Sequence, residues 1–219
     1  MDKNLLINLE SSLQGTLQFD KLSRALYATD ASVYRKVPLA VAFPKDENDI
    51  IKLIFFAKKN RIGLIPRTAG TSLAGQCVGD GIVVDVSRHM TKILNLDIEG
   101  KKVTVQPGVI RDELNEYLKD HGLFFGPNTS TSNRCMIGGM VGNNSSGTTS
   151  IQYGVTRDKV ISLKTILSDG SRGSFAALTS EEYKEKISLD NLEGTIYRSL
   201  FTELEKEQTQ QNIKKEFPK

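Results

Sequence analysis

Two segments rich in glycine and hydroxyl side chains hold the groups best suited to binding chemistry. The first begins at the end of an apolar run and contains Arg67, Thr68, Ala69, Gly70, Thr71, Ser72, Gly75 and Gln76. Its glycines let the main chain approach a ligand closely, and successive backbone N–H groups in such a turn bind anions. Hydroxyl donors and the fixed charge of Arg67 suit a phosphate or pyrophosphate. The alternative is that these glycines serve only tight turns.

The second segment runs from Gly126 to Gly147 and has four glycines within ten residues: Gly138, Gly139, Gly142 and Gly147. Adjacent glycines permit contact between the main chain and a flat or phosphorylated ligand. Asn143, Asn144 and Ser145 offer hydrogen bonds to sugar hydroxyls or ring edges. An exposed linker is the alternative, but it would leave Ile137, Met140 and Val141 in water.

Neither segment matches the two commonest nucleotide-binding motifs. Gly70 and Gly75 have the glycine spacing of a P-loop, but Gln76 replaces its lysine and Cys77 its serine or threonine, which disfavours ATP or GTP hydrolysis. The run from Gly138 to Gly142 has the wrong spacing for the dinucleotide-binding GxGxxG pattern.

The elements around these segments alternate between strands and helices. Residues 39–43, an apolar helical stripe over residues 50–59 and residues 64–66 predict a compact βαβ unit with parallel strands. Further along, we expect a strand at 82–86, a hairpin of 93–96 with 102–105, a helix at 111–119 and a strand at 160–167 that turns back at Asp169-Gly170. The first 25 residues look helical, and residues 67–81 and 126–154 are expected to lack regular structure. The polar tail from Glu203 predicts a solvated helix or a frayed end.

Composition excludes several classes of protein. The net charge of +3 over 219 residues is too weak to indicate a nucleic-acid partner. Cys77 and Cys135 are expected to be free thiols, and His89 and His121 are too far from them in sequence to predict a metal site. No apolar run approaches a transmembrane length, and the N-terminus lacks the features of a signal peptide, so we expect a cytoplasmic location.

The order of the blocks is specific to one family. The sequence reads PRTAGTSLAGQ, GIVVDVSRHMTKIL, VTVQPGV, IGGMVGNNSSG, YGVTRDKV and DG. From about Tyr27 to Gly170 it resembles the flavin domain of the p-cresol methylhydroxylase/vanillyl-alcohol oxidase type. Within that type it is most similar to D-lactate dehydrogenase/glycolate oxidase-like proteins, which are often fused to an iron–sulfur domain.

The resemblance implies an α+β fold with two lobes and FAD extended between them. The smaller lobe would contain the βαβ unit and span residues 38–98, and the larger, with a mixed sheet and flanking helices, would span 99–204. Residues 1–37 would be an N-terminal helix and connector, and 205–219 a polar tail. The residues implied in FAD binding are Arg67, Thr68, Ala69, Gly70, Thr71, Ser72, Gly75, Gln76, Pro107, Gly108, Ser130, Thr131, Ser132, Gly138, Gly139, Asn143, Gly147, Tyr153, Gly154 and Val160.

The chain departs from its relatives at three places. Thr68-Ala69 stands where relatives often carry two glycines, and alanine is small enough to keep the turn. Some flavin enzymes of this type attach the ring through a histidine in the first loop; that loop has none here, so we expect non-covalent FAD. Cys135 replaces a common threonine, and a small packed residue is favoured over a reactive thiol.

The sequence shows no catalytic acid–base pair and predicts no catalytic residue or metal ligand of its own. In this family the substrate cap lies C-terminal to the flavin domain, so we expect a fragment of a longer oxidoreductase, inactive alone. Its parent would oxidise a 2-hydroxy acid such as D-lactate or glycolate by hydride transfer to FAD. An iron–sulfur domain or subunit is the expected electron acceptor, and the full-length protein would be free in the cytoplasm or peripheral to the membrane. The alternatives are a stand-alone FAD-binding electron-transfer subunit and an NADPH-dependent reductase of the cell-wall-precursor type.

Overall fold

The structure is a computed structural model that describes residues 2–217. It divides the chain into two compact units, Met1–Val160 and Ile161–Lys219. Both mix helices with antiparallel or mixed sheets, in agreement with the expected α+β class. Every residue expected to bind the cofactor lies in the first unit.

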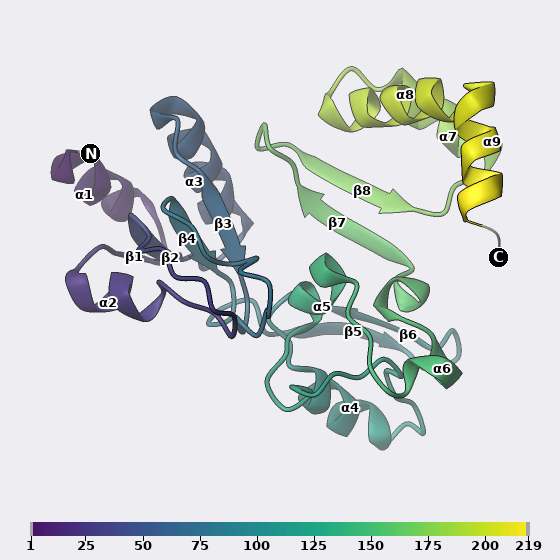
Figure 1. Ribbon diagram of the computed structural model, residues 1–219, viewed down its shortest axis with the longest axis horizontal. Helices are drawn as coiled ribbons and strands as arrows, with labels where there is room; N and C mark the ends of the chain where they lie inside the picture. The colour runs from purple at the N-terminus through teal and green to yellow at the C-terminus, as the bar shows by residue number, and fades with distance from the viewer. Residues whose placement is uncertain (1, 218–219) are drawn as a thin grey trace. The chain divides into compact units, whose positions relative to one another are not determined.

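A four-stranded sheet forms one half of the first unit (Figure 1). Its strands are β1 (Thr16–Gln18), β2 (Ala40–Phe43), β3 (Leu64–Arg67) and β4 (Ile82–Asp85), in the order β1-β2-β4-β3. β4 pairs in parallel with both β2 and β3, and β1 is antiparallel to β2. The predicted βαβ unit is confirmed as β2, α3 (Glu47–Asn60) and β3, with β4 lying between its two strands.

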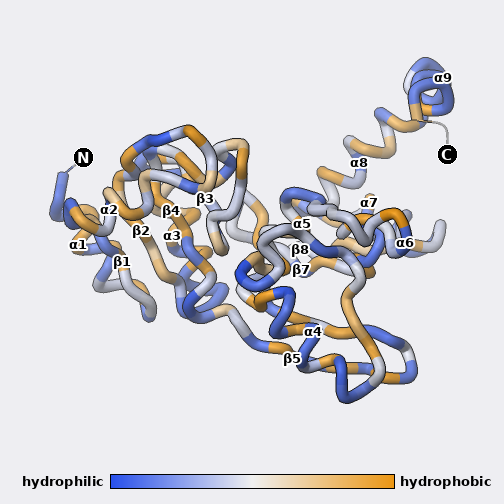
Figure 2. Tube along the Cα trace, turned by 60° about the horizontal axis from the view of Figure 1, so that its bottom comes forward, coloured by the Kyte–Doolittle hydropathy of each residue, from blue (hydrophilic) through white to orange (hydrophobic). Residues whose placement is uncertain are grey.

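The sheet buries apolar residues on both faces. Ala40, Ala42, Ile82 and Val84 pack with Leu53 of α3 and with leucines of the N-terminal helix, while Val41, Phe43 and Val83 form a second cluster with Tyr27 and Ile65. Continuous burial of β2 and β4 explains why both strands read as unbroken apolar runs. Figure 2 shows this hydrophobic colouring along β2 and β4.

The expectation of one helical segment over the first 25 residues is wrong. The chain forms α1 (Lys3–Ser12), then β1, then α2 (Lys21–Leu26). Gly15 lies so close to β2 that an added Cβ would come 2.0 Å from the Phe43 carbonyl oxygen. Asp20 then caps α2 by accepting hydrogen bonds from the backbone N–H groups of Leu22 and Ser23. Tertiary pairing with β2 therefore overrides the local helical pattern.

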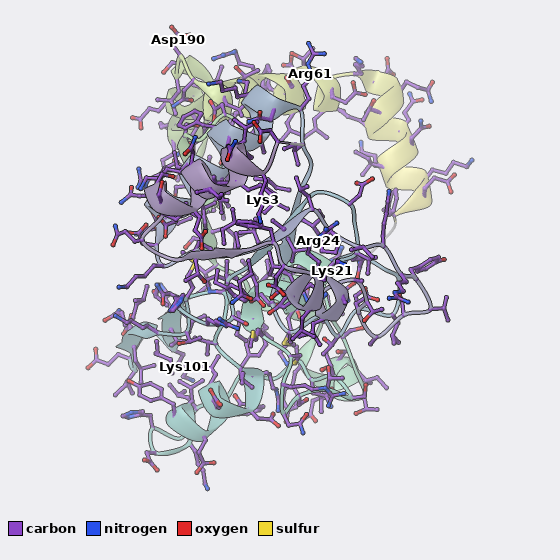
Figure 3. The ribbon with its side chains drawn as sticks, turned by 90° about the vertical axis from the view of Figure 1, so that its left-hand side faces the viewer. Lys3, Lys21, Arg24, Arg61, Lys101 and Asp190 are labelled. Carbon is purple, nitrogen blue, oxygen red and sulfur yellow. The ribbon has the colours of Figure 1, made fainter. Side chains whose placement is uncertain are left out.

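The other half of the first unit is built around a hairpin. β5 (Ile93–Asp97) pairs with β6 (Lys102–Val105), and α4 (Arg111–Lys119) covers them through Leu114 and Leu118. These elements confirm the predicted hairpin and helix. Lys101 at the hairpin turn and Arg61 after α3, both labelled in Figure 3, adopt left-handed backbone with φ of 51° and 55°. The proposed lobe boundary at residues 98/99 falls within this hairpin and stays a prediction.

The two long segments behave differently. Residues 68–81 contain no helix or strand, as predicted. Residues 126–154 do contain regular structure, contrary to expectation: α5 (Ile137–Asn143) and α6 (Ser150–Tyr153), followed by the 3₁₀ turn Thr156–Lys159. α5 forms because Met140 is buried beneath it, and Asn144 ends it in left-handed backbone.

The second unit is a hairpin with three helices. β7 (Ser162–Ile166) pairs antiparallel with β8 (Arg172–Ala176), which confirms the predicted strand and its return. Helices α7 (Ser180–Ser188), α8 (Leu192–Leu204) and α9 (Glu207–Glu216) follow. Glu193 of α8 is buried and accepts hydrogen bonds from Lys186 Nζ and from the Ser174 N–H, which ties α7, α8 and β8 together. α9 buries no residue and is largely hydrophilic (Figure 2), so the tail is a solvated helix.

Two searches of the described residues found no match. Among residues 2–217, no helix is both long and apolar enough to cross a membrane. The same residues contain no group of three or more His, Cys, Asp and Glu side chains placed to hold a metal ion.

Asp49 is the carboxylate that fastens α1 and β1 to the sheet. It is fully buried, and its oxygens accept hydrogen bonds from the backbone N–H groups of Gln14, Gly15 and Lys45 at 2.8–3.0 Å. Burial by itself raises the pKa of Asp49, but the N–H donors and nearby Lys52 outweigh it, so the pKa lies below its usual value. The ionised form is therefore the one that stabilises the fold.

We predict that Asp49→Asn lowers the free energy of unfolding by about 1–3 kcal/mol, because an amide cannot accept from all three donors. A depressed native pKa contributes stability above the unfolded value of about 3.9 and loses it as pH falls through the native pKa. Urea unfolding from pH 7 to pH 3 should therefore show a steeper acid loss in the wild type than in the variant. Asp46→Asn is the matched control because asparagine keeps the N-cap acceptor of α3; equal losses for both variants would contradict this account.

Candidate functional site

The structure brings the two glycine-rich segments together although they are about 70 positions apart. Gln76 Nε2 donates to Asn143 Oδ1 at 3.0 Å, and Gln76 Oε1 accepts from Ser72 Oγ at 2.6 Å. Gly139 lies against Thr68: an added Cβ would come 2.5 Å from the Thr68 hydroxyl oxygen. The first loop therefore faces α5, and the glycine at 139 is required by the approach of the two segments.

Pro107 and Gly108 form a third part of the same assembly. The Gly138 N–H donates to the Pro107 carbonyl at 2.8 Å, and an added Cβ on Gly138 would come 2.4 Å from Pro107 Cβ. Gly108 is buried, and its N–H donates to the Met90 carbonyl at 2.7 Å. The turn after β6 is thus fixed between β4's continuation and α5.

Arg67 ends β3 and leads directly into the first loop. Its guanidinium donates to the Thr29 carbonyl at 2.7 Å and lies 5.0 Å from the ring centroid of Tyr27. Gly70, with φ of +67°, folds the loop back over this side chain, and an added Cβ there would meet Arg67 Nη2 at 2.3 Å. Gly75 also has positive φ, +70°, so two of the predicted glycines occupy backbone conformations that favour glycine. Thr68, Ala69 and Thr71 lie in the same loop.

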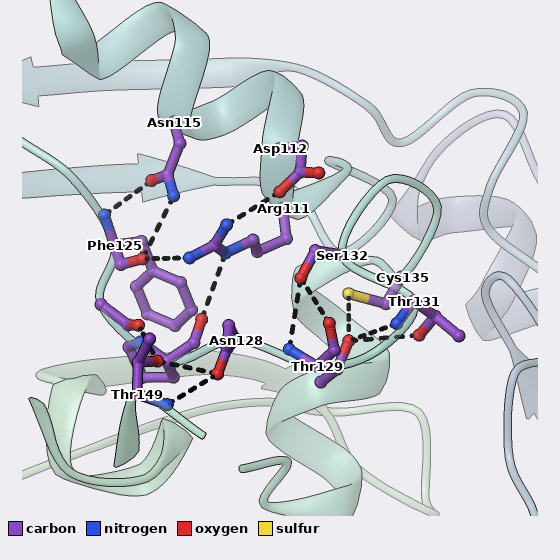
Figure 4. A network of polar contacts seen from close by, with 12 residues as sticks. Arg111, Asp112, Asn115, Phe125, Asn128, Thr129, Thr131, Ser132, Cys135 and Thr149 are labelled. Atoms are coloured by element: carbon purple, nitrogen blue, oxygen red, sulfur yellow. Dashed lines mark hydrogen bonds and ion pairs between the residues drawn. The ribbon is translucent and has the colours of Figure 1, made fainter. Parts of the chain in front are cut away.

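A polar network holds the beginning of the second segment against α4 (Figure 4). Arg111 donates to the carbonyls of Phe125 and Pro127, each at 3.2 Å, and pairs with Asp112 at 2.8 Å. Asn115 accepts from the Phe125 N–H at 2.7 Å and donates to the Phe125 carbonyl. These bonds fix the path of residues 125–127 before the chain reaches the predicted ligand contacts.

Ser130, Thr131 and Ser132 belong to a turn that closes on itself. Ser132 Oγ donates to the Thr129 carbonyl at 2.6 Å, and Thr131 and Thr129 share a hydroxyl contact of 3.1 Å. Cys135 is buried within this turn, with its Sγ accepting from Thr129 Oγ1 at 3.2 Å. The packed position supports the interpretation of Cys135 as a structural residue.

Four predicted residues contact a different part of the first unit. An added Cβ on Gly147 would meet Asn128, whose side chain also accepts from Thr149. Tyr153 packs edge-on against Phe124 at 5.1 Å, and Gly154, with φ of +78°, lies beside Asp158. Val160 is the last residue of the first unit. Their assignment to a ligand stays a prediction.

Several residues that shape the site were not predicted from the sequence. Arg111, Asn115, Asn128 and Thr149 hold the second segment, and Tyr27 and Asp85 lie beneath the first. Asp85 had a visible signal, since it is a charged residue at the end of an otherwise apolar strand. The others make contacts over 10 to 58 positions, which no local pattern encodes.

The arrangement is suited to holding a ligand. Main-chain N–H groups, hydroxyls and small residues converge from the first loop, the turn after β6 and α5, a combination that fits a diphosphate joined to flat rings. A side chain at 138 or 139 would collide with Pro107 or Thr68, so the small residues keep these three segments in close approach. The charged groups described here are engaged in fixing the backbone.

Comparisons with known proteins point in the same direction. The pattern of a family described as "FAD binding domain" matches residues 38–173. A D-2-hydroxyglutarate dehydrogenase of Pseudomonas putida is 39% identical over 191 residues, which is 86% of this chain and 19% of that protein. Glycolate oxidase subunit GlcD of Bacillus subtilis is 36% identical over 72% of this chain and 34% of its own length.

A solved structure of alkyldihydroxyacetonephosphate synthase has the same fold. It superposes with a TM-score of 0.71 over 84% of this chain and 40% of that one, at 22% identity. At this identity the likeness shows the fold alone, and it confirms the expected class. The chain spans about a fifth of the length of the D-2-hydroxyglutarate dehydrogenases that it matches.

The two ends of α5 should respond differently to an added methyl group. We predict that Gly138→Ala lowers the free energy of unfolding by about 1–3 kcal/mol, because the new Cβ meets Pro107, including its backbone. Gly142→Ala is the matched control: nothing lies within 4 Å of its Cβ, and alanine should add up to about 1 kcal/mol by helix propensity. Urea unfolding of both variants checks this, and a destabilising Gly142→Ala would show that α5 is not packed as described.

Proposed function

The chain belongs to the family of FAD binding domains, and from this premise we propose that it holds the FAD of a 2-hydroxy acid oxidoreductase. The observation that carries the proposal is the meeting of the first glycine-rich loop with Gly138 and Gly139 of α5. FAD, when bound, supplies a two-electron acceptor.

In this proposal the residues of the first unit bind and orient the cofactor. The loop residues Thr68 to Ser72, with Gly75 and Gln76, would surround the pyrophosphate. Gly138, Gly139, Asn143 and Pro107-Gly108 would line the opposite side. The lobes would be residues 38–98 and 99–204, and Tyr153, Gly154 and Val160 would lie toward the adenosine end.

The substrate class follows from the names of the relatives. They are dehydrogenases and oxidases of D-2-hydroxyglutarate, glycolate and D-lactate, all 2-hydroxy acids. The sequence analysis favoured D-lactate or glycolate, and the D-2-hydroxyglutarate dehydrogenases add a dicarboxylic member of the same class. The substrate pocket and the acid–base groups would come from segments outside this chain, because oxidation requires the substrate carbon held over the flavin ring.

An iron–sulfur domain or subunit is our proposed electron acceptor, and the cytoplasm, free or peripheral to the membrane, our proposed location. The support for both is the sequence resemblance. Reduction of an iron–sulfur centre by the hydroxy acid in the whole protein, followed by electron paramagnetic resonance, tests the acceptor.

The cofactor is tested by the absorption spectrum of the purified chain before and after acid precipitation. We predict that FAD absorbs in the native sample and is released into the supernatant, because the first loop has no histidine to attach it. A protein that is colourless and cannot be loaded with FAD would disprove the cofactor. Colour that stays in the pellet would contradict only non-covalent binding.

We further predict that Gly139→Val weakens FAD binding strongly, because its side chain would push Thr68 and the first loop away from α5. Gly142→Val is the control, since it makes the same change in helix propensity in open space on the same helix. Cys135→Ser should also retain FAD. Flavin fluorescence titration measures all three, and equal loss in the two valine variants would count against the site.

A further inference from the structure

We propose that Tyr27, Asp85 and Arg67 form a clamp that positions the first glycine-rich loop before any cofactor arrives, with Arg67 acting as a strut of the loop. Tyr27 lies before the matched family region, which begins at residue 38. The part of this inference that concerns FAD rests on the proposed function; the part that concerns the loop does not.

The clamp begins with a buried hydrogen bond between the N-terminal segment and the sheet. Tyr27 Oη donates to Asp85 Oδ2 at 2.6 Å, and Asp85 is buried at the end of β4. The other carboxylate oxygen of Asp85 accepts from the Ser87 N–H at 2.7 Å. Burial, followed by this bond to Asp85, raises the pKa of Tyr27, which keeps its hydroxyl protonated as the donor.

Tyr27 in turn fixes Arg67. The Tyr27 ring packs edge-on against Phe43 at 5.7 Å, and the Arg67 guanidinium lies 5.0 Å from the centroid of the Tyr27 ring. The same guanidinium donates to the Thr29 carbonyl at 2.7 Å, two residues beyond Tyr27. Cation–π contact and a charged donor thus hold the side chain from two directions.

Arg67 then supports the turn of its own loop. Gly70 crosses the guanidinium so closely that an added Cβ would come within 2.3–2.8 Å of Nη2, Cζ and Nε. A side chain held in this way cannot extend freely toward a ligand without releasing the turn. Its contribution is therefore to set the path of residues 68–72.

A second contact fastens the far end of the loop to the same segment. Cys77 is buried with its Sγ 3.6 Å from Asp30 Oδ2, and Gly75 approaches the ring of Tyr34. The segment is itself closed by the Lys36 N–H donating to the Ala28 carbonyl at 2.9 Å. Residues 27–36 thus contact the loop at both ends, an arrangement that reduces the ordering cost of binding.

The test uses two conservative variants of the chain. Tyr27→Phe keeps the ring and removes the bond to Asp85; Arg67→Lys keeps the charge and removes the planar fork. Without FAD, we expect faster amide hydrogen exchange in both at Ala74, Gln76 and Val78, whose N–H groups are bonded within the loop. With FAD, we expect affinity to fall about tenfold or more in fluorescence titration.

Asp49→Asn is the control for general destabilisation. It weakens the α1–β1 attachment elsewhere in the first unit, so at a temperature where it is folded it should change neither loop exchange nor FAD affinity. Unchanged loop exchange in Tyr27→Phe would overturn the clamp even if the wild type binds FAD. Faster exchange with unchanged FAD affinity would overturn its role toward the cofactor. Faster exchange in a chain whose wild type binds no FAD would leave the clamp standing and refute the proposed function.

Discussion

β4 pairs in parallel with both β2 and β3, and this pairing decides where the chain can place its ligand-binding groups. Parallel strands end at the same edge of a sheet, so Arg67 at the end of β3 stands opposite Asp85 at the end of β4. The connection between those strands is the first glycine-rich loop, and it must leave from this edge and return across the sheet. The chain after β4 continues through Val86 and Met90, whose carbonyls face Gly108. One strand pairing therefore sets the starting points of the loop and of the turn it meets.

Patterns that depend on neighbouring residues were predicted well. The apolar runs of β2 and β4, the stripe of α3 and the β5–β6 hairpin follow from local periodicity and turn chemistry. Asp49 shows where local reasoning ends. Its place near the start of α3 is explained by negative charge at a helix N-terminus, yet in the structure it accepts from Gln14 and Gly15, more than 30 residues away. The break between α1 and β1 depends on this contact, which is why those residues were read as helix.

The second glycine-rich segment was misread for a related reason. Glycine disfavours helix by about 1 kcal/mol per residue, and α5 contains three glycines. Burial of Met140 and the contacts of Gly138 with Pro107 compensate, because the absence of side chains lets the helix lie against the turn and the loop. The same glycines that argued for a loop in the sequence are those that allow a closely packed helix. Residue identity was thus informative about close approach and misleading about secondary structure.

Buried charge in the first unit is used for positioning. Asp49 binds three backbone N–H groups, Asp85 binds Tyr27 and Ser87, and Arg111 binds the carbonyls of Phe125 and Pro127. Groups engaged in this way stabilise one backbone path, and changing their protonation would release it. A general acid or base must exchange a proton during each turnover, which conflicts with that role. The charges that shape this unit are therefore poorly suited to proton transfer, and the proposed reaction assigns that step to groups beyond this chain.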